Sequence, residues 1–189
     1  MLMKQWIKSV ASRMGMHLYT DAFLPTGVGW LHDIRRSGLV SDAPLCFDVG
    51  ANVGQTVLVL KRSWPQASTH AFEPFSQPRA EQISVADRLT GVTPVDVALG
   101  AESGCALIQP REMSVLNSLL PSTASPSAGP AETIRIDTVD RYCASHGIGK
   151  IDVFKTDIKG FNLDVLQGAK HMLTRQRITF IHVEVTFLP

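Results

Sequence analysis

The stretch that decides the fold runs from residue 45 to residue 60 and reads Leu-Cys-Phe-Asp-Val-Gly-Ala-Asn-Val-Gly-Gln-Thr-Val-Leu-Val-Leu. Its apolar run over 45–49 predicts a strand, the glycine-spaced segment 50–54 predicts a tight turn, and the apolar segment from Val57 predicts a helix. Strand, turn and helix in this order open a nucleotide-binding α/β domain. The first and last glycines of the turn permit a sharp bend close to a ligand, where a Cβ would clash. The N–H groups of the turn and the positive end of the helix dipole would face that ligand.

Strand and helix patterns alternate on both sides of this stretch. Strands are expected at 45–49, 68–72, 93–98, 105–109, 133–136, 151–156 and 178–185. Helices are expected at 1–18, 30–37, 57–63, 78–89, 137–144 and 162–174. This alternation predicts an α/β protein with a Rossmann-like, doubly wound, mostly parallel sheet and helices on both faces. We expect a helical lead-in over 1–38 and one ligand-binding domain over 39–189.

Acidic residues fall at or near the carboxyl ends of the predicted strands, where a doubly wound sheet binds its ligand. They are Asp48, Glu73, Asp96, Asp157 and Glu184. A dinucleotide dehydrogenase would read Gly-x-Gly-x-x-Gly at the turn, which this chain does not. An acid in the turn would repel phosphate, so a cationic or amine-bearing ligand fits better. S-adenosylmethionine has a ribose, an amine and a sulfonium but no phosphate, and is the cofactor that these residues favour.

Composition limits the other classes of function. The chain has 18 basic and 17 acidic residues among 189, a net charge of +1, so no global charge drives it toward nucleic acid. Its three cysteines are far apart in sequence and odd in number, which disfavours a disulfide scaffold or a zinc site and favours a reducing, cytoplasmic setting. No apolar run approaches the ~20 residues that a membrane span needs.

The first twenty residues carry only basic charges, Lys4, Lys8 and Arg13. Apolar residues recur between them at helical spacing, which predicts an amphipathic helix. A helix packed on the domain is the favoured interpretation, and a transit peptide or a surface-lying helix are the alternatives.

Several ordered motifs together resemble the FkbM-type methyltransferases, a branch of the class I S-adenosylmethionine-dependent enzymes. The resemblance covers roughly 39–185. It rests on residues 47–55, 72–74, 97–100, 116–119, 138–140, 154–161, 164–169 and 181–185. Within these, Phe154 to Phe161 reads Phe-Lys-Thr-Asp-Ile-Lys-Gly-Phe and carries the most weight.

The resemblance implies a methyltransferase domain over 39–189 that uses S-adenosylmethionine, with O-methylation of a sugar, glycan or natural-product acceptor as the usual reaction. The cofactor-binding residues that it implies are Asp48, Gly50, Asn52, Gly54, Glu73, Asp96 and Ala98. The catalytic residues that we expect are Asp157, aided by His182 or Glu184 as proton acceptor. The acceptor pocket would include Asn117 and Lys159. No metal ligand is implied.

The chain departs from the family pattern in three places. The family usually has Asp-x-Glu-Gly where this chain has Lys159 in place of the Glu, and usually has an acid where Asn162 stands. Both changes remove negative charge beside the expected reaction centre. They favour an alternative function, a catalytically silent cofactor-binding or assembly module. The family fold also ends in a hairpin after the fifth core strand, so either the sequence is a fragment or an uncovered sheet edge invites pairing, as in a homo-oligomer.

Overall fold

The computed structural model describes residues 2–16, 19, 23–108 and 130–185. Asn117, an expected acceptor-binding residue, lies outside the described residues. The chain divides into two compact units, Met1–Gly38 and Leu39–Pro189, and each is described by itself.

The N-terminal unit contains α1 (Leu2–Arg13) and α2 (Trp30–Ser37). The bounds of α2 agree with the prediction, and the helix buries Leu31 and Ile34. Gly38 ends it in the left-handed conformation, with φ of 69°, as a C-cap glycine does. The predicted helix over 1–18 is too long, because α1 ends at Arg13 and Gly15 follows at a φ of 73°.

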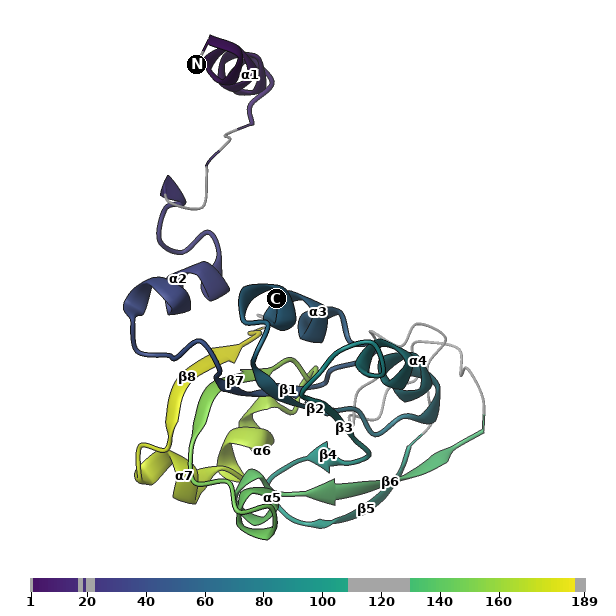
Figure 1. Cartoon of the computed structure of the whole chain (residues 1–189). Coiled ribbons are helices and arrows are strands. Elements are labelled where there is room, and N and C mark those ends of the chain that lie inside the picture. The colour runs from purple at the N-terminus through teal and green to yellow at the C-terminus, as the bar shows by residue number, and fades with distance from the viewer. Residues whose placement is uncertain (1, 17–18, 20–22, 109–129, 186–189) are drawn as a thin grey trace. The chain divides into compact units, whose positions relative to one another are not determined.

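The second unit is built on a five-stranded sheet in which every neighbouring pair is parallel (Figure 1). Its order is β3 (Val92–Val95), β2 (Ser68–Phe72), β1 (Leu45–Val49), β7 (Ile151–Thr156) and β8 (Ile178–Val183). The bounds of β1, β2 and β7 are those predicted. Because the chain builds outward from β1 to β3 and then returns to the other side of β1 as β7, the switch point lies between β1 and β7.

Helices cover both faces of this sheet (Figure 1). They are α3 (Gln55–Ser63) and α4 (Ser76–Ala86) on one face, and α5 (Val139–Ser145), α6 (Asn162–Gln167) and α7 (Lys170–Thr174) on the other. Side chains alternate along β1, so Phe47 and Val49 join the core with Val139 and Val165. On the other face, Val57 packs with Ala51 and Ala71. The predicted Rossmann-like, doubly wound fold is therefore confirmed.

A second, three-stranded sheet was not predicted. Its order is β4 (Ala98–Leu99), β6 (Glu132–Asp137) and β5 (Gly104–Ile108). The single strand expected over 93–98 is wrong, because this segment divides between the two sheets. The N–H of Glu73 donates to the carbonyl of Val95 at 3.1 Å, and the chain then leaves the main sheet for a parallel pairing of Ala98 with Ile136.

The helix predicted over 162–174 is broken at Gly168, which separates α6 from α7. A Cβ at Gly168 would overlap the carbonyl oxygen of Gly100, so the backbone approaches here as only glycine allows. The carboxylate of Asp140 accepts the N–H groups of His171 and Met172 at 2.7 and 2.9 Å and fixes the start of α7. In the sequence, the apolar residues keep their helical spacing through Gly168. The break therefore depends on these long-range contacts, which the sequence does not reveal.

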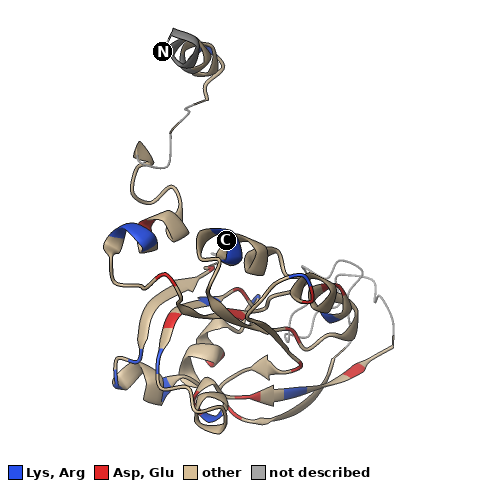
Figure 2. Cartoon of the chain, in the orientation of Figure 1, with Lys and Arg blue, Asp and Glu red and all other residues tan. Residues whose placement is uncertain are grey.

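The remaining predicted boundaries shift by a few residues. The helix expected over 137–144 begins at Val139, because the Thr138 hydroxyl accepts the N–H of Arg141 at 3.1 Å and caps it. Within the part of the chain that the structure describes, no helix has the length and apolar character to cross a bilayer. Figure 2 shows acidic and basic segments interspersed along the ribbon of the second unit.

Candidate active site

The turn after β1 brings its backbone close to the end of β7. Gly50 has a φ of 80°, and a Cβ there would lie 2.5 Å from the carbonyl oxygen of Asp157. The N–H groups of Gly50 and Ala51 both donate to the carbonyl of Phe72, at 3.1 and 3.0 Å. Asn52 also has a positive φ, of 48°, which a non-glycine residue rarely adopts. The turn therefore bends sharply at the switch point and leaves an opening above it.

Glu73 follows β2 and is tied to this turn. Its side chain is 6% exposed, and its carboxylate accepts the N–H of Asn52 and the N–H of Phe75, each at 3.0 Å. Burial raises the pKa of Glu73 to about 7, although the two backbone donors act in the opposite direction. A carboxylate oxygen can accept two hydrogen bonds, and each oxygen of Glu73 accepts one from the backbone. Glu73 can therefore still accept hydrogen bonds from a ligand.

Below the turn, Asp48 is fully buried and forms an ion pair with Lys155 of the neighbouring strand. The two residues are in register, and the Lys155 ammonium lies 3.0 Å from Asp48 Oδ1 and 3.5 Å from Asp157 Oδ2. Burial raises the pKa of Asp48, and the charge of Lys155 opposes that shift. The lysine is itself 7% exposed. One buried cation thus joins the acid beneath the turn to the acid at the end of β7.

Asp157 also interacts with the end of β8. The pKa of Glu184 is raised, first by a hydrogen bond with the side chain of Asp157 and then by the charge of that residue. His182 lies opposite Lys155 in the register of β7 and β8. Burial lowers the pKa of His182, and the charge of Lys155 adds to that effect. Two carboxyl groups and an imidazole therefore gather at the carboxyl ends of two adjacent strands.

Asn162 organises the backbone around this cluster. Its Oδ1 accepts the Thr156 hydroxyl at 2.7 Å and the N–H of Ile158 at 2.9 Å. Its amide nitrogen donates to the carbonyl of Glu184 at 2.7 Å. The amide thus joins the ends of β7 and β8, a task that needs both a donor and an acceptor.

We expect Asn162→Asp to reduce the free energy of unfolding by about 1–3 kcal/mol. The aspartate loses the donor to Glu184 and sets a carboxylate oxygen against that carbonyl. Chemical denaturation measures the loss, and Gln167→Glu, the same amide-to-acid change at an exposed position of α6, is the control. An equal effect in both variants would show that the Asn162 contacts are not specifically stabilising.

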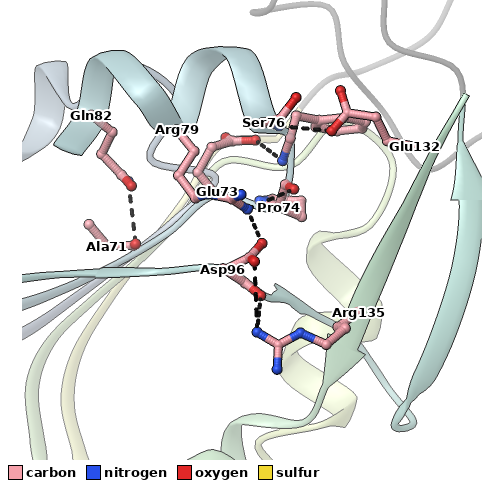
Figure 3. A network of polar contacts seen from close by, with 10 residues as sticks. Ala71, Glu73, Pro74, Ser76, Arg79, Gln82, Asp96, Glu132 and Arg135 are labelled. Atoms are coloured by element: carbon pink, nitrogen blue, oxygen red, sulfur yellow. Dashed lines mark hydrogen bonds and ion pairs between the residues drawn. The ribbon is translucent and has the colours of Figure 1, made fainter. Parts of the chain in front are cut away.

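Figure 3 shows a polar network outside the turn. Asp96 forms ion pairs with Arg79 of α4 and, at 3.8 Å, with Arg135 of β6, which also donates to the Asp96 carbonyl at 2.9 Å. Glu132 accepts the N–H of Ser76 at 2.9 Å. These contacts hold the small sheet against the start of α4, beside the segment that leads to Ala98.

A pocket opens between these groups and encloses about 830 Å³ of empty space, part of which is open solvent. The expected site residues that line it are Gly50, Asn52, Glu73, Ala98, Asp157 and Lys159. Others lie outside the lining set: Asp48 beneath the turn, Gly54 at the start of α3, Asp96 in the arginine network, and His182 and Glu184 at β8. The structure therefore brings residues from distant segments to one pocket at the switch point.

Lys155 is the site residue that the sequence reasoning missed. It also lines the pocket, together with Phe75 and Val97, whose side chains form an apolar wall of the pocket. A signal was present, because a lysine within a central strand has to find an anionic partner when it is buried. The identity of that partner depends on the strand order, which the sequence does not state.

The fold and the pocket define a Rossmann-like α/β protein with a pocket at the switch point, where proteins of this architecture bind nucleotide and nucleoside cofactors. The methyltransferase FkbM domain matches residues 48–189, and the chain belongs to this methyltransferase family.

Two curated relatives and one solved structure are similar to parts of the chain. The hexuronic acid methyltransferase AglP of Haloferax volcanii is 28% identical over 140 residues, which cover 74% of this chain and 54% of AglP. The methyltransferase sdnD of Sordaria araneosa is 26% identical over 155 residues, covering 66% of this chain and 60% of sdnD. A fibrillarin/Nop5p complex structure matches 68% of this chain and 44% of its own, at 13% identity and a TM-score of 0.37. The chain thus spans little more than half the length of the two curated relatives.

Proposed function

We propose that this chain binds S-adenosylmethionine and transfers its methyl group to a hydroxyl of a sugar, glycan or natural-product acceptor. The observation that carries the proposal is the buried carboxylate of Glu73, which is hydrogen-bonded to the glycine turn and lines the pocket. A carboxylate at this place suits the two hydroxyls of a ribose. The apolar wall of Phe75, Val97 and Ala98 suits an adenine ring. The absence of a Cβ at Gly50 lets the turn lie against the carbonyl of Asp157, which brings Glu73 and Asp157 to the same pocket.

The acids at the ends of β7 and β8 suit the acceptor. When bound, the cofactor supplies a sulfonium methyl, to which the acceptor oxygen bonds as the carbon–sulfur bond breaks and leaves its electron pair on sulfur. The hydroxyl proton needs an acceptor, and the Asp157–Glu184 pair provides one. Because the neighbouring Asp157 raises the pKa of Glu184, Glu184 is more basic than an isolated carboxylate. His182 stands beside it on β8, and its lowered pKa favours the neutral imidazole.

The family and its relatives support the proposed acceptor class. AglP is named for a hexuronic acid, a sugar with a carboxylate. Lys159 lines the pocket of this chain, where the family pattern has an acid. A cation at that place suits an acceptor with a negative charge better than a neutral one.

We expect the purified chain to bind S-adenosylhomocysteine with a micromolar dissociation constant in a calorimetric titration. The thioether product is used because it cannot react during the measurement. NAD, titrated in parallel, should give no heat, because the turn lacks the glycine fingerprint that binds a pyrophosphate. A folded chain that binds neither ligand would contradict the proposal, and binding of NAD alone would favour a dehydrogenase.

The second candidate function is a catalytically silent cofactor-binding or assembly module, and the replacement of the family acid by Lys159 favours it. It predicts binding of S-adenosylhomocysteine without methyl transfer from labelled cofactor to a panel of uronic acids and neutral sugars. Lys159→Glu separates the two candidates. Activity gained by this variant would indicate a decayed enzyme, whereas activity of the wild-type chain that falls in the variant would support the anionic acceptor.

A further inference from the structure

The amphipathic helix α1 has an apolar face that the proposed function does not use. At 100° per residue, Trp6, Val10 and Ile7 occupy one side of α1, and Met14, the residue after the helix, continues this side. By the same spacing, the positions of Arg13 and Lys4 flank the apolar side, and the position of Lys8 falls on the polar one. The pattern is that of a helix with one apolar and one polar face. Such a helix needs a partner for its apolar face.

Within the N-terminal unit this apolar face is not covered. Trp6 is 67% exposed and Met14 is 66% exposed, and Ile7 and Val10 are also exposed. A helix that packs on the core of its own unit buries these positions, as α2 buries Leu31 and Ile34. The exposed set includes a tryptophan, a residue that favours the boundary between water and lipid acyl chains.

The charges of this helix select the partner. Lys4, Lys8 and Arg13 lie in α1, and no acidic residue precedes Asp21. The whole chain has a net charge of only +1, so the basic charge is concentrated at this end. A protein partner with an acidic groove and an anionic lipid surface both complement it. The lipid surface fits better, because a single apolar face with basic residues beside it is the pattern of helices that lie in the plane of a bilayer.

We propose that α1 binds peripherally to membranes of anionic lipid. Its apolar face inserts among the acyl chains at the level of the headgroups, and its basic residues contact the lipid phosphates. This function goes beyond methyl transfer and depends only on residues of the N-terminal unit.

The test is co-sedimentation of the full chain with sucrose-loaded vesicles of phosphatidylcholine alone or mixed with phosphatidylglycerol. We expect binding to the mixed vesicles, much weaker binding to the neutral ones, and a decrease as salt is raised, because screening weakens the attraction. Each basic residue near an anionic surface contributes about a fivefold increase in partitioning, so Lys4→Gln/Lys8→Gln should lower partitioning about 25-fold. Trp6→Ser/Val10→Ser should abolish insertion.

The control is Lys170→Gln/Arg175→Gln, the same loss of charge at two exposed positions of the second unit. It should bind as the wild type does. Absence of binding to mixed vesicles would overturn the proposal and favour α1 packing on the rest of the chain. An equal loss of binding in Lys4→Gln/Lys8→Gln and in the control would overturn the proposal too, and so would full binding by Trp6→Ser/Val10→Ser. Either result would show non-specific electrostatic adsorption. Titration with S-adenosylhomocysteine checks that every variant retains its folded second unit.

Discussion

Lys155→Met should lower the free energy of unfolding by about 3–5 kcal/mol, a large fraction of the stability of a domain. The substitution removes the ammonium that lies 3.0 Å from the fully buried Asp48 and leaves that carboxylate without its cation. Burial already raises the pKa of Asp48 against the charge of Lys155. The variant must therefore keep an uncompensated buried charge or take up a proton on Asp48. Chemical denaturation at neutral pH measures the loss.

Two controls separate this effect from the loss of a long side chain. Lys61→Met removes a second buried lysine among the described residues, whose ammonium donates to the carbonyl of Ala67 at 2.7 Å, and should cost about 1.5–3 kcal/mol. Asp48→Asn/Lys155→Met removes both charges and should recover most of the stability. The deficit of the single variant should also shrink as pH falls, because protonation neutralises Asp48. A deficit equal to that of the Lys61 variant would mean that the ion pair contributes little.

The strands that form the centre of the sheet were predictable because local sequence decides them. The segments 45–49, 68–72 and 151–156 are short and bounded by turn residues, and the structure has them at those bounds. The segment 93–98 was not predictable, because its division between two sheets depends on pairing with β6, more than thirty residues later in the chain. Gly168 illustrates the same limit, since the break that it marks depends on the approach of Gly100.

The candidate site shows the same division between local and long-range information. The glycine turn and the acids at strand ends follow from residue type and order, and Glu73 and Asp157 do line one pocket. Lys155 could not be assigned, because its two carboxylate partners come together only when β1 and β7 are neighbours. The departure at Asn162 also has a structural basis that the sequence did not reveal, since its amide donates to a carbonyl that follows β8. The roles of the site residues stay predictions.

Glu73→Ala should weaken the binding of S-adenosylhomocysteine about 100-fold, the loss expected when hydrogen bonds to a charged acceptor are removed. The variant takes away the carboxylate that the turn and the N–H of Phe75 hold at the pocket wall. Isothermal titration calorimetry at pH 8 measures the change. Glu81→Ala, which removes an exposed acid of the neighbouring helix α4, is the control and should leave the affinity unchanged. An unchanged affinity in the Glu73 variant would show that the ribose does not bind this carboxylate.

The pH dependence of the same titration tests the ionised form of Glu73 directly. Because burial raises its pKa to about 7, the carboxylate is largely protonated below that pH and can no longer accept both ribose hydroxyls. The dissociation constant should therefore rise by up to about tenfold for each unit of pH below 7 and be flat above it, and Glu73→Ala should lose this dependence.

The stability of the unliganded chain depends on pH in the opposite sense, because without ligand the protonated form of Glu73 is favoured. Its raised pKa means that the folded state binds this proton more tightly than the unfolded state does. That contribution to stability is present in full below pH 4.5 and is lost as pH rises through 7, a difference of about 3 kcal/mol. The ionised carboxylate at neutral pH thus reduces the stability of the free protein, and a ligand that donates hydrogen bonds to it restores part of that loss. A dissociation constant that stays the same between pH 5.5 and pH 8 would contradict the role of Glu73 as the acceptor.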